Sequence, residues 1–199
     1  MKDIKLMVVG DGGIGKTSLL MTYAYNCFPA HAPPLFEREY KSVSVDDNQV
    51  NIDLWDCMSP KEYEKVRALQ YPKTDVFLLC YSVDSPESLK NIRTHWFPEV
   101  RQHVPKAQKI LVGLKSDLRK HSKLNKNNQS VNVDQQISQR KAKAQDCFVA
   151  MPDVRALSQE IGAVCLLECS ALEMESTKKV FKKAVWACRP SWKQRCVLL

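Results

Sequence analysis

The sequence contains no run of about 18 apolar residues, the length that a membrane-spanning helix requires, so no such helix is predicted. Its eight cysteines include no C-x-x-C pair and no Cys/His spacing that suits zinc. The residues after Met1 lack the long apolar stretch of a secretory signal, and we expect reduced thiols in the cytosol. A chain of 199 residues is expected to form one domain with a substantial core.

Aromatic residues are absent between Arg119 and Gln145, where seven Lys or Arg residues accompany a single Asp. Sites that bind single-stranded nucleic acids combine basic residues with aromatic side chains on which bases stack. We therefore expect no nucleic-acid partner, although the formal net charge is +8. Residues at about 120–150 also contain few apolar side chains, so we expect a polar surface insertion, partly helical over Gln135–Gln145 or disordered.

Short apolar runs alternate with segments of helical periodicity along the rest of the chain. The expected parallel strands are Ile4–Val9, Val50–Trp55, Val76–Ser82, Lys109–Leu114 and Val164–Cys169. The expected helices are Lys16–Tyr25, Lys61–Gln70, Glu87–His95, Asp153–Ile161 and Ser176–Ala187. A hairpin is expected to add one antiparallel edge strand, from Tyr40–Val45 and a turn at Asp46, Asp47 and Asn48. The fold class is therefore α/β, with a mainly parallel six-stranded sheet, helices on both faces and ligands beyond the carboxyl ends of the strands.

A predicted phosphate-binding loop follows the first of these strands. The pattern G-x-x-x-x-G-K-[ST] is matched by Gly10, Asp11, Gly12, Gly13, Ile14, Gly15, Lys16 and Thr17, and Ser18 comes next. Glycines let the backbone wrap closely around an anion, while Lys16 and the helix N-terminus supply positive potential. The hydroxyl of Thr17 suits Mg²⁺, which prefers oxygen ligands. A glycine-rich turn without a ligand is the alternative, but the flanking strand and helix favour a nucleotide site.

Three further motifs follow later strands of the expected sheet. Asp56 ends one strand, where a carboxylate can hold Mg²⁺ through water. Asp117, with Lys115 two residues before it, can accept two N–H bonds from guanine that adenine cannot supply. The last strand is followed by Ser170, Ala171 and Leu172, whose backbone N–H groups can bind a base carbonyl. Together these motifs predict a guanine nucleotide pocket.

The motifs resemble those of the small GTPases, and the chain resembles the Rho family, nearest its Rac-like branch. The resemblance extends over nearly the whole chain outside the insertion, through Gly10–Thr17, Leu54–Asp56, Tyr71–Pro72, Thr74–Val76, Asp84–Leu89, Trp96, Pro98–Val100, Ile161–Val164 and Glu168–Leu172. It implies a P-loop fold, GTP or GDP and Mg²⁺ as cofactors, a monomer, and effector and regulatory proteins whose identity the sequence does not give. It also implies that Phe28 packs against the guanine, that Asp117 selects it, and that Ser170–Leu172 close over it.

The chain departs from the family at positions that hold the nucleotide and sense its terminal phosphate. Family members carry Asn or Thr before the motif lysine; here it is Leu114, so a hydrogen bond that tethers the loop is lost and looser nucleotide binding is expected. They also carry a threonine in the first switch that ligates Mg²⁺. An ungapped reading places Leu35 there, and no Ser or Thr occurs between Tyr23 and Lys41. Opening and closing of this loop should therefore depend less on the nucleotide.

The second switch is altered as well. Family members follow the strand aspartate with Thr, Ala, Gly and Gln, whereas this chain has Cys57, Met58, Ser59 and Pro60. Pro60 has neither an N–H group nor a side-chain amide, so it cannot orient the attacking water. We therefore assign no catalytic residue and expect very low intrinsic and stimulated hydrolysis. Ser59-Pro60-Lys61-Glu62 has the form of a capping box that predicts a pre-formed helix start; drift after the loss of hydrolysis is the alternative.

The carboxyl-terminal end, Cys196–Leu199, is a C-a-a-X motif whose final Leu favours geranylgeranylation of Cys196. One lipid chain rarely anchors a protein stably, so a second signal is expected. Cys188 is either an acylation site or a thiol packed at the end of the last helix. We thus expect a GTPase domain over residues 1–188 and a prenylated tail over 189–199, on the cytoplasmic face of a membrane, expected to be the plasma membrane, with a cytosolic pool.

The sequence leaves several functions open. The first is a membrane-anchored signalling protein that binds GTP or GDP with weak or absent hydrolysis and, by family resemblance, takes part in cytoskeletal or polarity signalling. The second is a competent GTPase that uses unusual groups, and the third is a scaffold that does not switch. A phosphotransferase with the same loop would leave Asp117 and Ser170–Leu172 unexplained.

Overall fold

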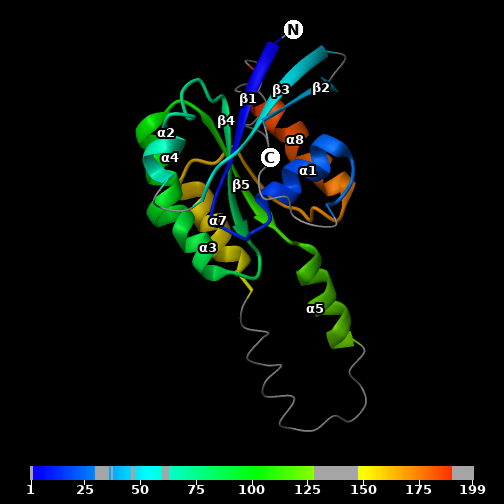
Figure 1. Cartoon of the computed structure of the whole chain (residues 1–199). Helices are drawn as coiled ribbons and strands as arrows, with labels where there is room; N and C mark the ends of the chain where they lie inside the picture. The colour runs from blue at the N-terminus through cyan, green and yellow to red at the C-terminus, as the bar shows by residue number, and fades with distance from the viewer. Residues whose placement is uncertain are drawn as a thin grey trace.

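A six-stranded sheet forms the centre of the computed structural model, which describes residues 2–29, 36, 38–45, 48–59, 63–127 and 148–189. The strands lie in the order β2-β3-β1-β4-β5-β6 (Figure 1). Their bounds are β1 (Lys2–Val9), β2 (Glu39–Val45), β3 (Asn48–Asp56), β4 (Val76–Ser82), β5 (Gln108–Leu114) and β6 (Cys165–Glu168). All neighbours are parallel except β2 and β3, which pair antiparallel, so the expected fold class is confirmed.

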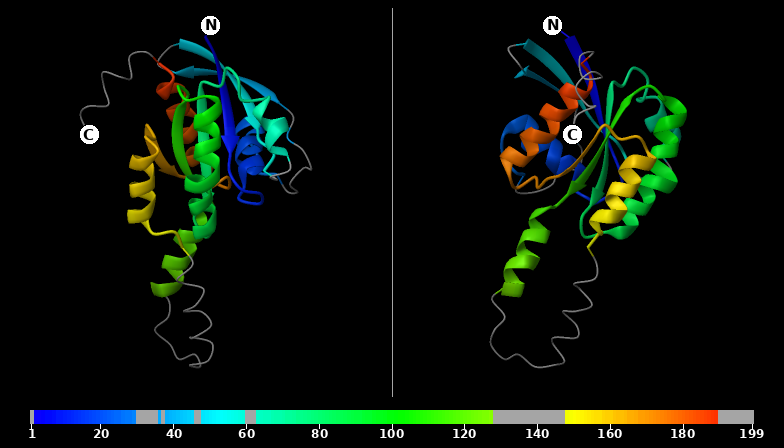
Figure 2. Two further views of the ribbon diagram at one scale, coloured as in Figure 1. Left: turned by 90° about the vertical axis from the view of Figure 1, so that its left-hand side faces the viewer. Right: turned by 180° about the vertical axis from the view of Figure 1, so that it is seen from behind.

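Helices cover both faces of this sheet (Figures 1 and 2). One face carries α1 (Lys16–Tyr25) and α8 (Met174–Ala187), which contact each other through the stacked rings of Tyr23 and Phe181. The other face carries α2 (Glu64–Ala68), α3 (Pro86–Asn91), η2 (Ile92–Trp96), α4 (Phe97–His103) and α7 (Met151–Glu160). No helix in these described ranges has the length and apolar character needed to traverse a lipid bilayer.

The central strand β4 shows why the sequence forms this layered structure. All seven of its residues are buried, as expected for an apolar run with helices on both sides. Because successive side chains point to opposite faces, Leu78 and Cys80 belong to the core under α1 and α8. Phe77 and Leu79 belong to the second core, under η2 and α7. The hydrophobic run therefore fixes the strand at the centre of the domain.

The second-switch helix begins later than the sequence predicts. We expected a helix over Lys61–Gln70 capped by Ser59, but α2 begins at Glu64 and its N-cap residue is Tyr63, without a side-chain cap. The hydroxyl of Ser59 accepts a hydrogen bond from Lys16. The capping box predicted for Ser59 stays a prediction, because its partners at Lys61 and Glu62 are not among the described residues. Pro60, Lys61 and Glu62 lie outside the described residues.

The insertion also begins differently from our expectation. Helix α5 (Asp117–Asn127) continues directly from the base-binding motif and leads away from the sheet (Figures 1 and 2). Its first turn is fixed by tertiary contacts: Leu118 packs against a core cluster, and Arg119 forms an ion pair with Glu168 at 3.0 Å. These contacts could not be predicted from the polar composition of the segment. The helix expected over Gln135–Gln145 lies outside the described residues.

The helical segment after β4 runs further than the expected Glu87–His95. It starts at Pro86, where the Ser85 hydroxyl accepts from the Ser88 N–H group at 3.2 Å, and it continues to His103 through the π-helical stretch η2. Such stretches are rare and frequently lie at functional sites. This one lies beside the phosphate-loop motif, as the contacts of Trp96 show below.

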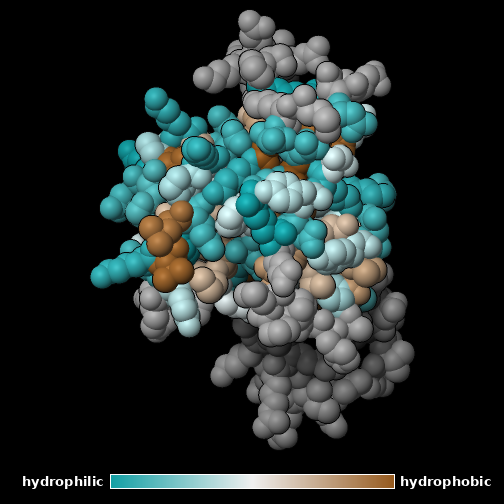
Figure 3. All heavy atoms as spheres, turned by 45° about the horizontal axis from the view of Figure 1, so that its top comes forward, coloured by the Kyte–Doolittle hydropathy of each residue, from teal (hydrophilic) through white to brown (hydrophobic). Residues whose placement is uncertain are grey.

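The molecular surface in Figure 3 is mostly hydrophilic, with hydrophobic side chains in small separate groups. Large apolar side chains are nevertheless exposed on α2 and at the residues that flank it. Tyr63, Val66 and Leu69 are 46%, 47% and 81% exposed. This segment therefore presents an apolar surface next to the candidate site.

Candidate nucleotide site

The loop from Gly10 to Gly15 connects β1 to α1 at the carboxyl end of the sheet. Gly10 has a φ of +146°, and a Cβ atom there would lie 2.3 Å from the carbonyl oxygen of Cys80. Gly15 has a φ of +105° and is the N-cap residue of α1. Only glycine adopts these conformations without strain, so the motif glycines bring the backbone close to β4 and open the N-terminus of α1.

Lys16 lies at the phosphate end of this loop and is 6% exposed. Its ammonium donates to the carbonyl oxygen of Asp11 at 2.7 Å and to the hydroxyl of Ser59 at 2.6 Å. Burial lowers the pKa of Lys16, although the negative charge of Asp56 opposes this shift. The positive charge of this buried ammonium favours binding of an anion at the loop.

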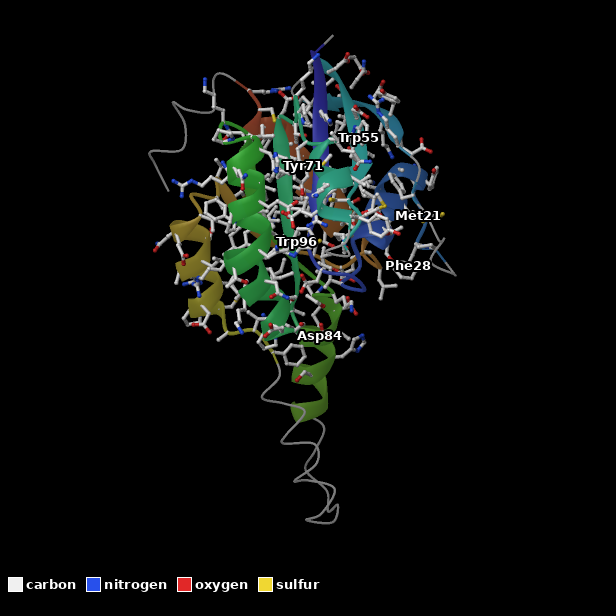
Figure 4. The ribbon with its side chains drawn as sticks, turned by 60° about the vertical axis from the view of Figure 1, so that its left-hand side comes forward. Met21, Phe28, Trp55, Tyr71, Asp84 and Trp96 are labelled. Atoms are coloured by element: carbon white, nitrogen blue, oxygen red, sulfur yellow. The ribbon has the colours of Figure 1, made fainter. Side chains whose placement is uncertain are left out.

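The side chain of Asp11 is held by the helical segment on the other side of the loop. Its carboxylate accepts from the indole N–H of Trp96 at 2.7 Å and from the Asn91 amide at 2.8 Å. Trp96 is 1% exposed, and the guanidinium of Arg67 lies 4.9 Å from the centre of its ring. Figure 4 shows the position of Trp96. Asp11 thus fixes the phosphate loop to η2. Its carboxylate accepts from Trp96 of η2, and its backbone carbonyl accepts from Lys16.

Thr17 and Asp56 lie side by side at the end of β3. The Thr17 hydroxyl donates to Asp56 Oδ2 at 2.5 Å. Asp56 Oδ1 is buried and has no hydrogen-bond partner among the described residues. Burial raises the pKa of Asp56, and the hydrogen bond from Thr17 and the charge of Lys16 only partly offset this rise. A buried carboxylate oxygen without a partner, beside a hydroxyl, fits a hard cation such as Mg²⁺.

A cavity of about 210 Å³ adjoins this phosphate end. Its lining residues come from four separate segments of the chain: Ile14, Gly15, Ser18, Phe28, Leu114, Lys115, Asp117, Ser170, Ala171 and Leu172. Nine of these ten were predicted site residues. The remaining predicted residues lie at the phosphate end: Gly10, Asp11, Gly12, Gly13, Lys16, Thr17 and Asp56. The fold therefore places a base-sized pocket next to a phosphate-binding loop.

Backbone contacts hold together the two segments that are predicted to bind the base. The Ser116 N–H group donates to the carbonyl of Cys169 at 3.1 Å, which links the segment after β5 to the segment after β6. Lys115 has a φ of +60°, an uncommon conformation for a residue other than glycine. The Leu172 N–H group donates to the Ser170 hydroxyl at 3.2 Å. The segment after β6 thus forms a tight turn over the pocket.

The rim of the pocket is formed by two exposed apolar side chains, Phe28 (47%) and Leu172 (59%). Such exposed apolar groups at a pocket mouth are suited to covering the faces of a flat base. Figure 4 shows Phe28 on the α1 side of the sheet, away from Tyr71 and Trp96. The packing of Phe28 against a guanine stays a prediction.

Leu114 takes the place of the polar residue that the family carries. Its side chain is 2% exposed and lines the base pocket. A Cβ atom on Gly15 would lie 4.0 Å from Leu114 Cδ1 and also 4.0 Å from Lys115 Cε. Leu114 belongs to the same hydrophobic cluster as Ile14 of the phosphate loop, so an apolar side chain stands where Asn or Thr would offer a hydrogen bond.

Sequence reasoning missed three residues at this site. Asn91 and Trp96 hold Asp11, and Ser59 binds Lys16 through its side chain. Trp96 had been read only as a marker of resemblance, and Ser59 as a helix cap. The only sequence feature that could have indicated the role of Ser59 is the position of its hydroxyl, three residues after Asp56. Leu35 and Cys196 lie outside the described residues, as does Pro60.

Comparisons with known proteins agree with this geometry. The sequence model of the Ras family matches residues 5–189. The Rho-related GTP-binding proteins RhoV of Mus musculus and Homo sapiens are each 40% identical to this chain over 183 residues. The matched region covers 92% of this chain and 72% of each RhoV protein. The phosphate loop, the base pocket and these matches together show that the chain belongs to the Rho family of small GTP-binding proteins.

Proposed function

We propose that this Rho family protein binds GTP or GDP with Mg²⁺, hydrolyses GTP very slowly, and recruits protein partners at a membrane. The observation that carries the proposal is the cavity lined by Asp117 and Ser170–Leu172 beside the buried Lys16. A base pocket joined to a phosphate loop suits a nucleotide, and a carboxylate that accepts two N–H groups favours guanine over adenine.

Each end of the site has a distinct role in this proposal. Asp117 accepts from the guanine, Phe28 packs against its face, and Lys16 with the α1 N-terminus binds the phosphates. Thr17 and Asp56 would hold Mg²⁺, which neutralises phosphate charge when bound. The unpartnered Asp56 Oδ1 supports this assignment, because an uncompensated buried carboxylate oxygen is costly.

Slow hydrolysis is supported by the residues that follow Asp56. Orienting a water molecule requires a side-chain acceptor or amide at the position of Pro60, and proline has neither. The first switch has Leu35 where a hydroxyl would ligate the metal ion. An activating protein's arginine accelerates hydrolysis by about 10³-fold to 10⁵-fold, but it acts on a water molecule already in place. Stimulated turnover should therefore also be very low.

Partner binding is supported by the apolar surface of α2. Tyr63, Val66 and Leu69 expose large apolar side chains on or beside α2. This helix is connected to the phosphate loop, because its Arg67 packs on Trp96 and Trp96 binds Asp11. Exposed apolar groups of this kind are typical of protein–protein interfaces. Membrane attachment is supported by the C-a-a-X sequence at Cys196.

The test of nucleotide binding and hydrolysis is to extract nucleotide from the purified full-length chain and follow one turnover of GTP with and without Mg²⁺. Mostly GTP with negligible decay supports the proposal. Brisk decay shows a competent GTPase with unusual groups, and the absence of guanine nucleotide shows a scaffold. The variant Pro60→Gln should accelerate decay if the missing amide limits hydrolysis.

The test of membrane attachment is transfer of labelled geranylgeranyl from its diphosphate by a prenyltransferase, followed by vesicle sedimentation. The parent chain should take up label and sediment with vesicles, whereas Cys196→Ser should do neither. Cys188→Ser is the matched control and should still take up the label. Label on the Cys196→Ser variant would contradict the assignment.

A further inference from the structure

The hydrogen bond between Lys16 and Ser59 connects the phosphate loop to the segment after β3. Ser59 Oγ lies 2.6 Å from Lys16 Nζ, and this ammonium also donates to the Asp11 carbonyl at 2.7 Å. A hydroxyl that accepts from a cation keeps its own O–H group as a donor. Since the cation polarises that O–H group, it becomes a better donor to an anion.

The position of Ser59 along the loop indicates which phosphate it would meet. Gly15 lines the base pocket, so it marks the end of the loop nearest the base. A Cβ atom on Gly12 would lie 3.9 Å from Ser59 Cβ, so Ser59 lies across the distal part of the loop. A phosphate chain that runs from Gly15 toward Gly12 therefore reaches Ser59 last.

The segment that carries Ser59 is held from behind by buried groups. The Met58 carbonyl accepts from Arg67 at 3.5 Å, and Cys57 Sγ lies 3.9 Å from the Tyr71 hydroxyl. Arg67 belongs to α2, is 0% exposed and pairs with Glu99. The segment of Ser59 is thus connected to α2 through the contact between the Met58 carbonyl and Arg67.

We propose that Ser59 is a specificity-determining residue: its hydroxyl accepts from Lys16 and donates to the terminal phosphate, so that the site prefers a nucleoside triphosphate to a diphosphate. This inference rests on the proposed binding of guanine nucleotide. It assigns to a hydroxyl of the second switch the phosphate-sensing contact that Leu35 in the first switch cannot make. The diphosphate does not extend to Ser59, so this hydroxyl acts on its affinity only through Lys16 and should affect it less than the affinity for the triphosphate.

The experiment measures the affinity of the full-length chain with Mg²⁺ for GDP and for a non-hydrolysable GTP analogue, by displacement of a fluorescent GDP. For Ser59→Ala, the ratio of triphosphate to diphosphate affinity should fall about 10-fold to 100-fold, as expected for loss of a hydrogen bond to a charged group. The affinity for GDP should change less than the affinity for the analogue, and retained GDP binding shows that the variant folds. Ser59→Thr should keep the ratio of the parent chain.

Ser44→Ala is the matched control, because it removes the same hydroxyl from an exposed position on β2 and should change neither affinity. An unchanged ratio in Ser59→Ala would overturn the inference, and so would an increased ratio, which would mean that Ser59 competes with the phosphate for Lys16. Loss of GDP affinity in this variant would show a structural role and also overturn it. If the parent chain binds neither nucleotide, the proposed function fails together with the inference; if it binds both but the ratio is insensitive to Ser59, only the inference fails.

Discussion

The guanidinium of Arg67 and the carboxylate of Glu99 form a two-point ion pair inside the protein, with Nε–Oε1 and Nη2–Oε2 distances of 2.7 Å. The side chains of Arg67 and Glu99 are 0% and 4% exposed. The Tyr71 hydroxyl also donates to Glu99 Oε1 at 2.7 Å. This network fastens the second-switch helix α2 to α4, because Arg67 and Glu99 lie on these two helices.

Removing the charge of Glu99 should strongly destabilise the fold. Glu99→Gln leaves the Arg67 guanidinium buried without a counter-ion, which costs about 3 to 5 kcal/mol of unfolding free energy. Tyr71→Phe removes one hydrogen bond to the same carboxylate and should cost only about 1 kcal/mol. Urea unfolding monitored by fluorescence measures both values. Equal losses in the two variants would contradict a dominant role for the ion pair.

The same pair should make stability depend on pH at the acid end. Burial by itself raises the pKa of Glu99, but the hydrogen bonds from Arg67 and Tyr71 more than offset this and hold the pKa below its ordinary value of 4.5. A lowered pKa in the folded state adds stability that is present above the ordinary value and is lost as pH falls through the folded value. Unfolding free energies measured from pH 6 downward should therefore fall less steeply in Glu99→Gln than in the parent chain.

Gly10 should not tolerate a side chain, whereas Gly12, two residues later, should tolerate a methyl group. In Gly10→Ala the new Cβ would lie 2.3 Å from the Cys80 carbonyl oxygen at a φ of +146°, so we expect a loss of about 3 kcal/mol or more. In Gly12→Ala the nearest atom is Ser59 Cβ at 3.9 Å, so the unfolding free energy should change by no more than about 0.5 kcal/mol. Thermal unfolding of both variants measures the contrast, and a stable Gly10→Ala would disprove the close packing.

Asp56 should be required for Mg²⁺ to slow the release of GDP. Asp56→Asn removes the charge beside Thr17, so the affinity of the GDP complex for Mg²⁺ should fall about 10-fold to 100-fold. The measurement is release of fluorescent GDP during a titration with a chelator. Chelation should accelerate release from the parent chain, and only weakly from the variant. Equal acceleration in both would remove Asp56 from the metal site.

The nucleotide-free chain should show the opposite effect of the same substitution. Since burial raises the pKa of Asp56, its ionised form is disfavoured in the folded state. This cost is present above the raised folded pKa and fades as pH falls toward the ordinary carboxyl value. Asp56→Asn should therefore unfold at a higher temperature than the parent chain near neutral pH without nucleotide, and the difference should shrink in acid.

Asp117 should determine the choice of base. Asp117→Ala removes an acceptor for two N–H groups, so the preference for GDP over ADP should fall by about 100-fold, mainly through weaker GDP binding. Competition of each nucleotide against fluorescent GDP measures this preference. Glu87→Ala, which removes an exposed acid at the start of α3, is the control and should leave it unchanged. Unaltered selectivity in Asp117→Ala would contradict the base assignment.

Much of the fold could be predicted because its signals are local. The bounds of β4 and α1 agree with prediction, since a fully apolar run and the residues after a glycine loop each specify one kind of structure. The start of α2 lies at Glu64 and not at the predicted Lys61. The hydrogen bond from Lys16 to the Ser59 hydroxyl could not be predicted from a local pattern, because only the fold brings this buried ammonium to Ser59.

The amino-acid sequence by itself determined the family, the phosphate loop and the residues of the base pocket, because short motifs after apolar strands converge at one edge of a parallel sheet. Only the tertiary structure decided what holds these parts in place. Asp11 and Trp96 are 85 residues apart in sequence, Lys16 and Ser59 are 43 apart, and Arg67 and Glu99 are 32 apart. Hydrogen bonds between such distant residues depend on how helices pack across the sheet, and no spacing in the chain encodes that packing.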